Sequence, residues 1–268
     1  MLPSDSATVI RDEAGIWRCE SVAGVAYPHD GHKTMREVED DSFWFRHRNR
    51  CIVETVRRLP PSGPILDIGA GNGFVARALA EAGFAAWAME PSWAGVTAAR
   101  RRGIEHVIHG AFHDTGFAAN TVPAAALFDV IEHVSDDVGM LRDIRMALRP
   151  RGRLYVTVPA HRFLFSNADR DAQHFRRYTA NTLNRVLTHA GFHLEFGTYF
   201  FAPLIAPIFL FRTIPSWVGL RRDNGESAAM YHRARRIVDA LLDREARAIA
   251  KGKPRAVGAS CLMVARKS

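Results

Sequence analysis

The sequence has few of the features that mark several large protein classes. Its three cysteines, Cys19, Cys51 and Cys261, lie far apart and form no C-x-x-C pair, which supports neither a zinc knuckle nor a disulfide framework. The first residues, MLPSDSATVIRDEAG, contain acids and no apolar core segment, unlike a signal peptide. One apolar run, YFFAPLIAPIFLF, has only 13 residues and two prolines, too short and broken to cross a bilayer. We therefore expect a cytoplasmic protein.

The charge balance is basic, with 36 Lys and Arg against 28 Asp and Glu and a net charge of +8. This balance suits nucleic acid, an anionic membrane surface or an acidic substrate. The sequence has no recognisable nucleic-acid module and no RNP-type aromatic pattern, so nucleic acid is the least favoured of these partners.

Hydrophobic periodicity divides the chain into three parts. Residues 1–59 are predicted to form an N-terminal arm and a helical lid, with the helix in FWFRHRNRCIVETVRRL ending before PPSGP. Residues 60–200 and 256–268 alternate short apolar runs with amphipathic helices, and residues 201–255 form an apolar and basic helical insertion. Seven strands are expected, in PILDIG, AAWAMEP, HVIHG, AAALFDV, RLYVTVPA, FHLEFGTYFF and GASCLMVARK. The alternation predicts an α/β fold with a mainly parallel seven-stranded sheet and helices on both faces.

The segment ILDIGAGNGF, residues 65–74, follows the first of these strands with glycines at 69, 71 and 73. Glycines there let the backbone turn sharply and let a ligand approach closely. A dinucleotide loop, G-x-G-x-x-G, would need glycine at position 74, where Phe74 stands. Glu90 ends the next strand and is placed to accept hydrogen bonds from both ribose hydroxyls. A ribosyl ligand other than a dinucleotide is therefore favoured.

In this order along the chain, ILDIGAGNGF, AMEPS, LFDVIEHVSDD, LRDIRMALRPRGRLYVTVPA and HFRRYTANTLNRVLTHAGF resemble the class I S-adenosylmethionine-dependent methyltransferases. The resemblance extends from about Phe43 to the last strand and implies a Rossmann-like fold that binds S-adenosylmethionine and releases S-adenosylhomocysteine. It implies that Asp67 and the glycines line the methionine part, that Glu90 holds the ribose, and that Phe128 and Asp129 flank the cofactor. The implied cofactor-binding residues are Asp67, Gly69, Ala70, Gly71, Asn72, Gly73, Glu90, Pro91, Phe112, Phe128 and Asp129.

The chain departs from this family where the adenine amino group is expected to bind. Many relatives have an acid after the third strand, whereas GAFHD places Ala111 there. Packing by Phe112 and backbone amides would then recognise adenine, with His113 or Asp114 as helpers.

The segment FDVIEHV supplies candidate catalytic groups. Asp129, Glu132 and His133 stand at i, i+3 and i+4, which on a helix is one face. His133 is the first choice for a base that removes a proton from the acceptor, with Asp129 and His174 as further candidates. Two alternatives stay open: Glu132 and His133 hold the local structure, or Asp129, Glu132 and His133, with His161, bind a divalent metal.

The acceptor is expected between the fifth strand and the next helix, in SNADRDAQHFRRYT. The candidate substrate-binding residues are His161, Asp171, Arg177, Tyr178 and, from the lid, Arg48. Alternatively, Arg177 pairs with Asp169 or Asp171 while Tyr178 fills the core. The apolar segment 199–217 is a candidate cover for the acceptor pocket, homodimer face or peripheral membrane contact.

The sequence therefore predicts a methyltransferase acting on a small-molecule or lipid-linked acceptor, with oxygen preferred over nitrogen or carbon. Two alternatives come from other classes. One is an NAD-dependent oxidoreductase, which Phe74 argues against, and the other is a non-catalytic cofactor-binding scaffold.

Overall fold

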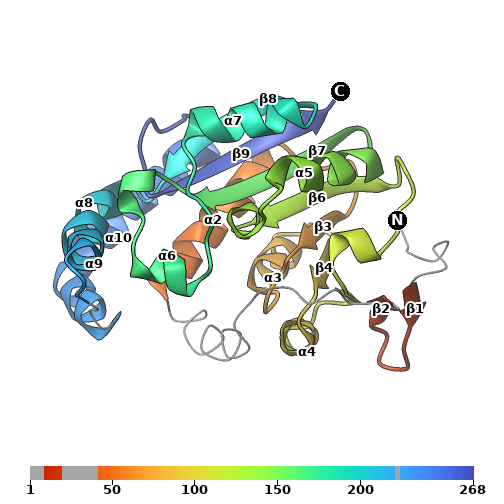
Figure 1. Ribbon diagram of the computed structural model, residues 1–268, viewed down its shortest axis with the longest axis horizontal. Helices are drawn as coiled ribbons and strands as arrows, with labels where there is room; N and C mark the ends of the chain where they lie inside the picture. The colour runs from red at the N-terminus through yellow and green to blue at the C-terminus, as the bar shows by residue number, and fades with distance from the viewer. Residues whose placement is uncertain (1–8, 20–41, 221–223) are drawn as a thin grey trace.

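The computed structural model describes residues 9–19, 42–220 and 224–268, with the backbone alone for 224–235. A nine-stranded sheet has the order β1-β2-β5-β4-β3-β6-β7-β9-β8 (Figure 1). All neighbours from β2 to β7 are parallel, and β9 runs antiparallel to β7 and β8. The strands are β1 Val9–Arg11, β2 Trp17–Cys19, β3 Ile65–Ile68, β4 Ala86–Glu90, β5 His106–His109, β6 Val122–Phe128, β7 Leu148–Pro159, β8 Phe192–Phe200 and β9 Ser260–Lys267.

The sheet is covered by helices on both faces (Figure 1). The α-helices are α2 Phe43–Arg58, α3 Phe74–Glu81, α4 Trp93–Arg101, α5 Asp137–Ala147, α6 Asn167–Asp171, α7 Ala180–His189, α8 Ile205–Ile208, α9 Ile214–Trp217 and α10 Asn224–Ala250. Short 3₁₀ turns are η2 Phe112–Asp114, η3 Ile131–His133, η4 Arg162–Leu164 and η5 Ala202–Leu204, and η6 Phe209–Thr213 is a π-helical turn.

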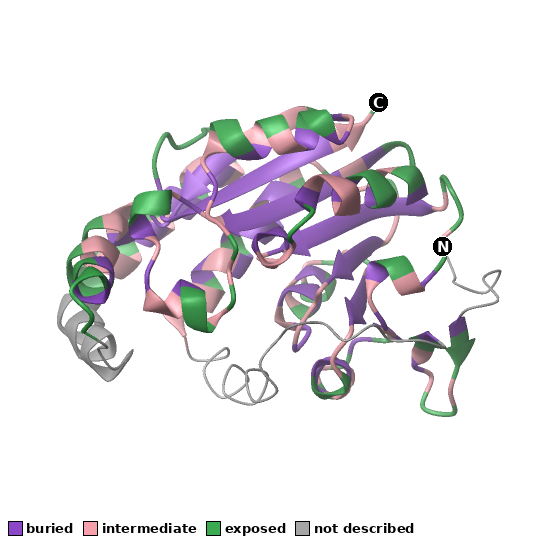
Figure 2. Ribbon diagram, in the orientation of Figure 1, coloured by how far each residue is buried: buried purple, intermediate pink, exposed green. Residues whose placement is uncertain are grey.

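The core lies on both faces of the sheet because the central strands are buried throughout (Figure 2). Every residue of β6, VPAAALF, is buried, as a parallel strand between two helical layers requires. On one face, Ile52 and Val56 of α2 pack in the same apolar cluster as Ile249 of α10. On the other face, side chains of α5 and α7 pack in a second cluster that includes Leu141 and Leu187.

The seven expected strands all form, but the sheet has two more than predicted. Residues 9–19, expected to belong to a loose arm, form the antiparallel hairpin of β1 and β2, and β2 pairs in parallel with β5. Each of these strands has three residues, too few for a period-two pattern to be visible in the sequence.

The helix ends follow the predicted local signals. Helix α2 covers the described part of the expected lid helix and ends before Pro60. Helix α7 follows Thr179, whose hydroxyl accepts a hydrogen bond from the amide of Thr182 at 3.2 Å, as predicted for an N-cap. Between β8 and β9, the expected insertion forms the elements η5 to α10. The described part of the chain contains no helix with the length and apolar character that crossing a bilayer requires.

The parallel arrangement gathers four strand ends at one edge of the sheet. Strands β3, β4, β6 and β7 end at Ile68, Glu90, Phe128 and Pro159. The loops that follow these ends therefore meet in space, although they lie far apart in sequence. In open α/β sheets this carboxyl edge is where ligands bind.

Candidate active site

The glycine loop after β3 is held in a conformation that side chains rarely adopt. Gly69, Gly71 and Gly73 have φ of 72°, 55° and 76°, in the left-handed region. A Cβ at Gly69 would lie 2.8 Å from Cγ2 of Val130, and one at Gly73 would lie 2.9 Å from Cβ of Ala99. A Cβ at Gly71 would meet no described atom within 4 Å. Two glycines are thus required by packing, whereas Gly71 faces open space.

Glu90 ties the end of β4 to this loop. Its carboxylate accepts hydrogen bonds from the amide of Gly71 at 2.9 Å and from the amide of Ser92 at 2.8 Å. Burial raises the pKa of Glu90 to about 7, although these two amides stabilise its charged form. The side chain is therefore fixed beside the open space at Gly71.

A second buried acid, Asp67, lies in β3 just before the same loop. The Asp67 side chain is 1 % exposed, and its Oδ2 has no hydrogen-bond partner among the described residues. Burial raises the pKa of Asp67 to about 7, with Arg48 opposing the shift and Glu90 adding to it. A buried carboxyl oxygen without a partner is costly, so this atom is suited to a polar or cationic ligand.

Helix α2 brings Arg48 over the end of β6. Its Nη1 donates to Oδ2 of Asp129 at 2.5 Å, across 81 residues of sequence. Asp129 has φ of 59°, and its Oδ1 also accepts from the hydroxyl of Thr157 at 3.2 Å. Helix α2 therefore reaches the strand edge directly, and the predicted residues Arg48 and Asp129 are brought together.

The expected helical face of Asp129, Glu132 and His133 is wrong. Asp129 stands in a left-handed turn before η3, which spans only Ile131–His133 and has 3₁₀ geometry. Glu132 is completely buried, and neither carboxylate oxygen has a hydrogen-bond partner among the described residues. Burial raises the pKa of Glu132 well above its usual range, and Asp129 adds to this shift.

His133 and His174 meet at this position from different segments. Their rings lie edge to face with centroids 4.6 Å apart. Burial, together with His174, lowers the pKa of His133 to about 4. Potential ligand atoms of Glu132, His133 and His174 all lie within 4.8 Å of one another. This group differs from the predicted metal set, because His174 joins it while Asp129 and His161 do not.

Asp169 organises the loop that was expected to hold the acceptor. Its Oδ1 pairs with Nδ1 of His174 at 2.9 Å and accepts from Nε of Arg177 at 2.7 Å, and its Oδ2 accepts from Nη2 of Arg177 at 3.1 Å. Burial opposes the charge on Asp169, but the hydrogen bonds from His174 and Arg177 hold its pKa well below the usual range. Arg177 is therefore committed to a buried ion pair.

The other predicted acceptor residues lie in different environments. The hydroxyl of Tyr178 is buried and donates to Asp137 at 2.7 Å, which places this side chain in the core. Asp171 is exposed at the end of α6. His161 has φ of 60° and stacks on Tyr199, with centroids 5.1 Å apart. Of these three residues, His161 is the one on the loop that directly follows the end of β7.

At the expected adenine end, Phe112 is 9 % exposed and stacks on Phe117 at 5.8 Å. The amide of Ala111 donates to Oδ2 of Asp114 at 3.1 Å, so an acid does reach this turn from three residues further on. Phe128 is buried at the end of β6. The carboxylate of Asp114 therefore lies beside the backbone amide of Ala111 in this turn.

Two buried polar residues of this edge, Thr157 and Asp169, are not among the predicted site residues. Thr157 is a buried hydroxyl near the end of β7, and Asp169 enters the sequence prediction only as a partner of Arg177. A small polar residue in the apolar run YVTVP is the signal that would have indicated Thr157. For Asp169, the capping pattern of Ser166 followed by Asp169 at the start of α6 would have indicated burial and fixed geometry.

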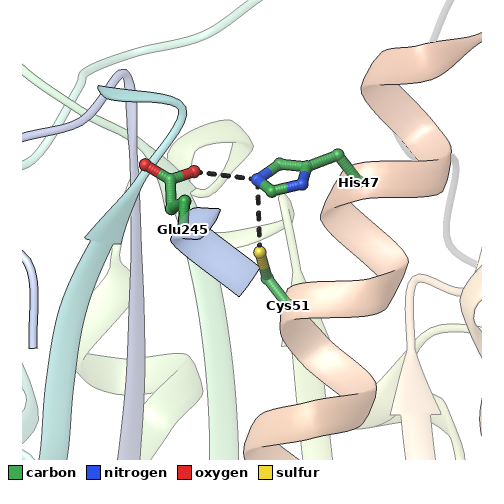
Figure 3. A group of neighbouring side chains, drawn as sticks. All are labelled: His47, Cys51 and Glu245. Atoms are coloured by element: carbon green, nitrogen blue, oxygen red, sulfur yellow. Dashed lines mark hydrogen bonds and ion pairs between the residues drawn. The ribbon is translucent and has the colours of Figure 1, made fainter. Parts of the chain in front are cut away.

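A second group of potential metal ligands lies away from this edge, between α2 and α10 (Figure 3). Nε2 of His47 lies 2.8 Å from Oε2 of Glu245 and 3.4 Å from Sγ of Cys51. Both contacts use the same nitrogen, so the group cannot relay a proton from thiol to carboxylate through the ring. Glu245 also accepts hydrogen bonds from the amides of Phe201 and Ala202, at 2.7 and 3.0 Å. These contacts join α2, α10 and the turn after β8.

The residues at the strand edge fit an adenosyl sulfonium cofactor. Open space at Gly71 lies beside the fixed carboxylate of Glu90, which retains lone pairs for ribose hydroxyls. The unpartnered oxygen of Asp67 is nearby, and a cationic ligand would stabilise two carboxylates whose charge burial disfavours.

The strand order and this loop define the class, a Rossmann-like class I S-adenosylmethionine-dependent methyltransferase. A family model described as a methyltransferase domain matches residues 42–195, over half of the chain, so the chain belongs to this family. A probable S-adenosylmethionine-dependent methyltransferase of Mycolicibacterium smegmatis is 27 % identical over 175 residues, covering 63 % of this chain and 67 % of that protein. A protein of Mycobacterium tuberculosis with the same description is 26 % identical over 167 residues, covering 60 % of each.

The matched part of this chain therefore spans 67 % of the length of the first relative and 60 % of the length of the second. A solved structure from Thermotoga maritima, described as an S-adenosylmethionine-dependent methyltransferase and possible histamine N-methyltransferase, has a TM-score of 0.57 at 19 % identity. The match covers 90 % of this chain and 99 % of that one. At this identity the likeness concerns the fold alone.

Proposed function

We propose that the protein transfers the methyl group of S-adenosylmethionine to a small-molecule or lipid-linked acceptor in the cytoplasm, at an oxygen atom. The observation that carries this proposal is the hydrogen bond from the amide of Gly71 to Glu90, beside space that no described side chain fills. Asp67 and the glycine loop would hold the methionine part, Glu90 the ribose, and Phe112 with the turn at Ala111 the adenine.

When bound, the cofactor supplies an electrophilic methyl group on a sulfonium whose departure as a neutral thioether needs no acid. The protein's contribution is then mainly alignment, which can contribute up to roughly 10 kcal/mol. The pair of Arg48 and Asp129 spans the edge between α2 and β6. It would close the site from the lid side and orient the acceptor.

An oxygen acceptor must also lose a proton. The sequence favours His133 for this role, but a pKa of about 4 makes it a neutral yet weak base. His174 is better placed, because Asp169 holds its Nδ1 at 2.9 Å, which fixes the ring and leaves Nε2 as the nitrogen that can face an acceptor. We therefore assign proton removal to His174, with His133 packed against it.

The test is calorimetric titration of the full chain with S-adenosylhomocysteine and, separately, with NADH. Binding of the former and not the latter is expected, and the opposite result would favour an oxidoreductase. Radiolabelled S-adenosylmethionine is then incubated with fractionated metabolites and lipids. Cofactor binding without transfer to any fraction would favour a non-catalytic scaffold. A labelled methyl group on nitrogen or carbon would replace the assignment to oxygen.

Metal-assisted activation of the acceptor is a second candidate, favoured by the two unpartnered oxygens of Glu132. Because Asp169 occupies Nδ1 of His174, Nε2 is the nitrogen that this ring can offer. Glu132, His133 and His174 would then supply one oxygen and two nitrogens, a set suited to Zn²⁺ or Mn²⁺. Full activity after exhaustive chelation excludes this candidate. Loss that added metal restores in the wild type, and not in Glu132→Gln, supports it.

A further inference from the structure

The segment from η5 to α9 presents an unusually apolar surface. Its exposed residues include Leu210 at 52 %, Ile214 at 37 %, Trp217 at 58 % and Val218 at 67 %. They are spaced four, three and one residues apart, so they share one side of a continuous helical segment. We call the set Phe163, Leu210, Phe211, Ile214, Trp217, Val218 and Leu220 the apolar cap surface.

Polar residues of the same segment point inward. Thr213 is completely buried, and its hydroxyl donates to the carbonyl of Leu164 at 3.3 Å. The hydroxyl of Ser216, 9 % exposed, accepts from the amide of Asn167 at 2.8 Å. A helix whose outer face meets water normally has the reverse pattern, with polar residues outside. The segment is therefore anchored through its polar side, and its apolar side faces away from the protein.

The exposed aromatic rings are connected. Phe209 contacts both Phe163 and Trp217 edge to face, with centroids 5.8 and 5.6 Å apart. The ring of Phe163 also stacks on His161 at 5.4 Å, next to the end of β7. The apolar cap surface is thus continuous from α9 to η4 and reaches the loop beside the candidate active site. Figure 1 shows α8 and α9 together at one end of the molecule.

The charges around this surface are mostly positive. Residues 201–220 contain no Asp or Glu, and Arg212 is their one charged residue. Arg162 of η4 and Arg170 of α6 are exposed beside the segment, and Nη1 of Arg170 lies 3.4 Å from the hydroxyl of Ser216. Asp171 is the exposed acid of α6. Apolar side chains flanked by arginines are complementary to a bilayer interface with anionic headgroups.

We propose that the apolar cap surface docks on an anionic membrane surface, with its aromatic and aliphatic side chains among the acyl chains and the flanking arginines at the headgroups. A second copy of this chain fits less well. In a two-fold interface the same patch meets itself, so the arginines Arg162 and Arg170 of both copies would be brought together. Residues 201–220 contain no acid to pair them, and Asp171 of α6 is one exposed acid against these two arginines. The proposal concerns membrane binding and holds whether or not methyl transfer is found.

The experiment is co-sedimentation of the full chain with vesicles of phosphatidylcholine, alone or with an equal part of phosphatidylglycerol. We expect the protein to bind the mixed vesicles, and this binding should weaken when salt is added. Binding to vesicles of phosphatidylcholine alone should be weaker than binding to the mixed vesicles. The double variant Leu210→Glu with Trp217→Glu should bind the mixed vesicles at least about tenfold more weakly than the wild type, because two apolar anchors are lost. Met146→Glu is the matched control, since Met146 is 61 % exposed on α5, away from this surface.

Circular dichroism and affinity for S-adenosylhomocysteine check that each variant is folded. Equal loss of vesicle binding in Met146→Glu and the double variant would overturn the proposal, as would a wild-type protein that stays in the supernatant with both vesicle types. A third result would also overturn it: a wild-type dimer, seen by analytical ultracentrifugation, that dissociates in the double variant while vesicle binding is unchanged. That outcome would assign the surface to a second copy.

Discussion

Alanine substitution at the three loop glycines should separate binding from folding. All three have positive φ, so each alanine costs roughly 1–2 kcal/mol of backbone strain. At Gly73 the added Cβ would also lie 2.9 Å from Cβ and 3.0 Å from Cα of Ala99. Since backbone cannot easily move aside, this overlap adds about 1–3 kcal/mol. At Gly71 no described atom lies within 4 Å, so strain is the only cost to the folded protein.

Cofactor affinity should fall more in Gly71→Ala than in Gly73→Ala, which is the reverse of the order expected for stability. The Cβ of Gly71→Ala enters the space beside Glu90, and an overlap of about 1–3 kcal/mol lowers affinity roughly 5- to 150-fold. Gly71→Val should abolish measurable binding for the same reason. Gly73→Ala should unfold at clearly lower urea concentration, yet its folded fraction should keep more affinity than Gly71→Ala.

Urea denaturation measures the first quantity, and calorimetric titration with S-adenosylhomocysteine measures the second. The reasoning is refuted if Gly71→Ala loses as much stability as Gly73→Ala while its affinity is unchanged. In that case the space at Gly71 would not be the cofactor's.

Three further predictions follow from buried polar groups. Asp169→Ala leaves Arg177 buried without its partner and should cost about 3–5 kcal/mol in urea denaturation; a loss below about 1 kcal/mol contradicts this. Glu245→Ala removes the acceptor of two backbone amides and of His47, so we expect a loss of about 2 kcal/mol or more, with S-adenosylhomocysteine affinity in the folded protein retained. Burial lowers the pKa of His133 from 6.5 to about 4, so the unfolded chain binds more protons in this window and stability falls as pH falls through it. His133→Asn should flatten part of that decline, and an unchanged slope in thermal denaturation from pH 7 to pH 4 would contradict the shift.

The local patterns of the sequence were sufficient for the fold. The signals that predicted the fold lie within short segments of the chain: the periodicity of strands and helices, the glycine triplet and Glu90. Such segments form their strands, helices and turns through hydrogen bonds within one βα unit or between neighbouring units. For this reason the seven strands and the loop at residues 69–73 could be predicted. The strands β1 and β2 could not, because three residues carry no periodicity and their pairing depends on the edge of β5.

The composition of the site was decided by tertiary contacts. Arg48 meets Asp129 across 81 residues, and His47 meets Glu245 across 198. No spacing in the sequence encodes such pairs, because they depend on how α2 packs against the completed sheet and α10.

Glu132 and His133 show the same contrast between what local sequence patterns predict and what tertiary contacts decide. Their spacing from Asp129 suggests one helical face, but the positive φ of Asp129 breaks the helix before it begins. The fold then brings His174 and Asp169 beside them from a segment some 40 residues further on. The sequence alone determined a methyltransferase fold with its cofactor loop, since those depend on local backbone preferences. Only the tertiary structure decided which polar groups are buried together and which apolar side chains face outward, because both depend on contacts between segments distant in the chain.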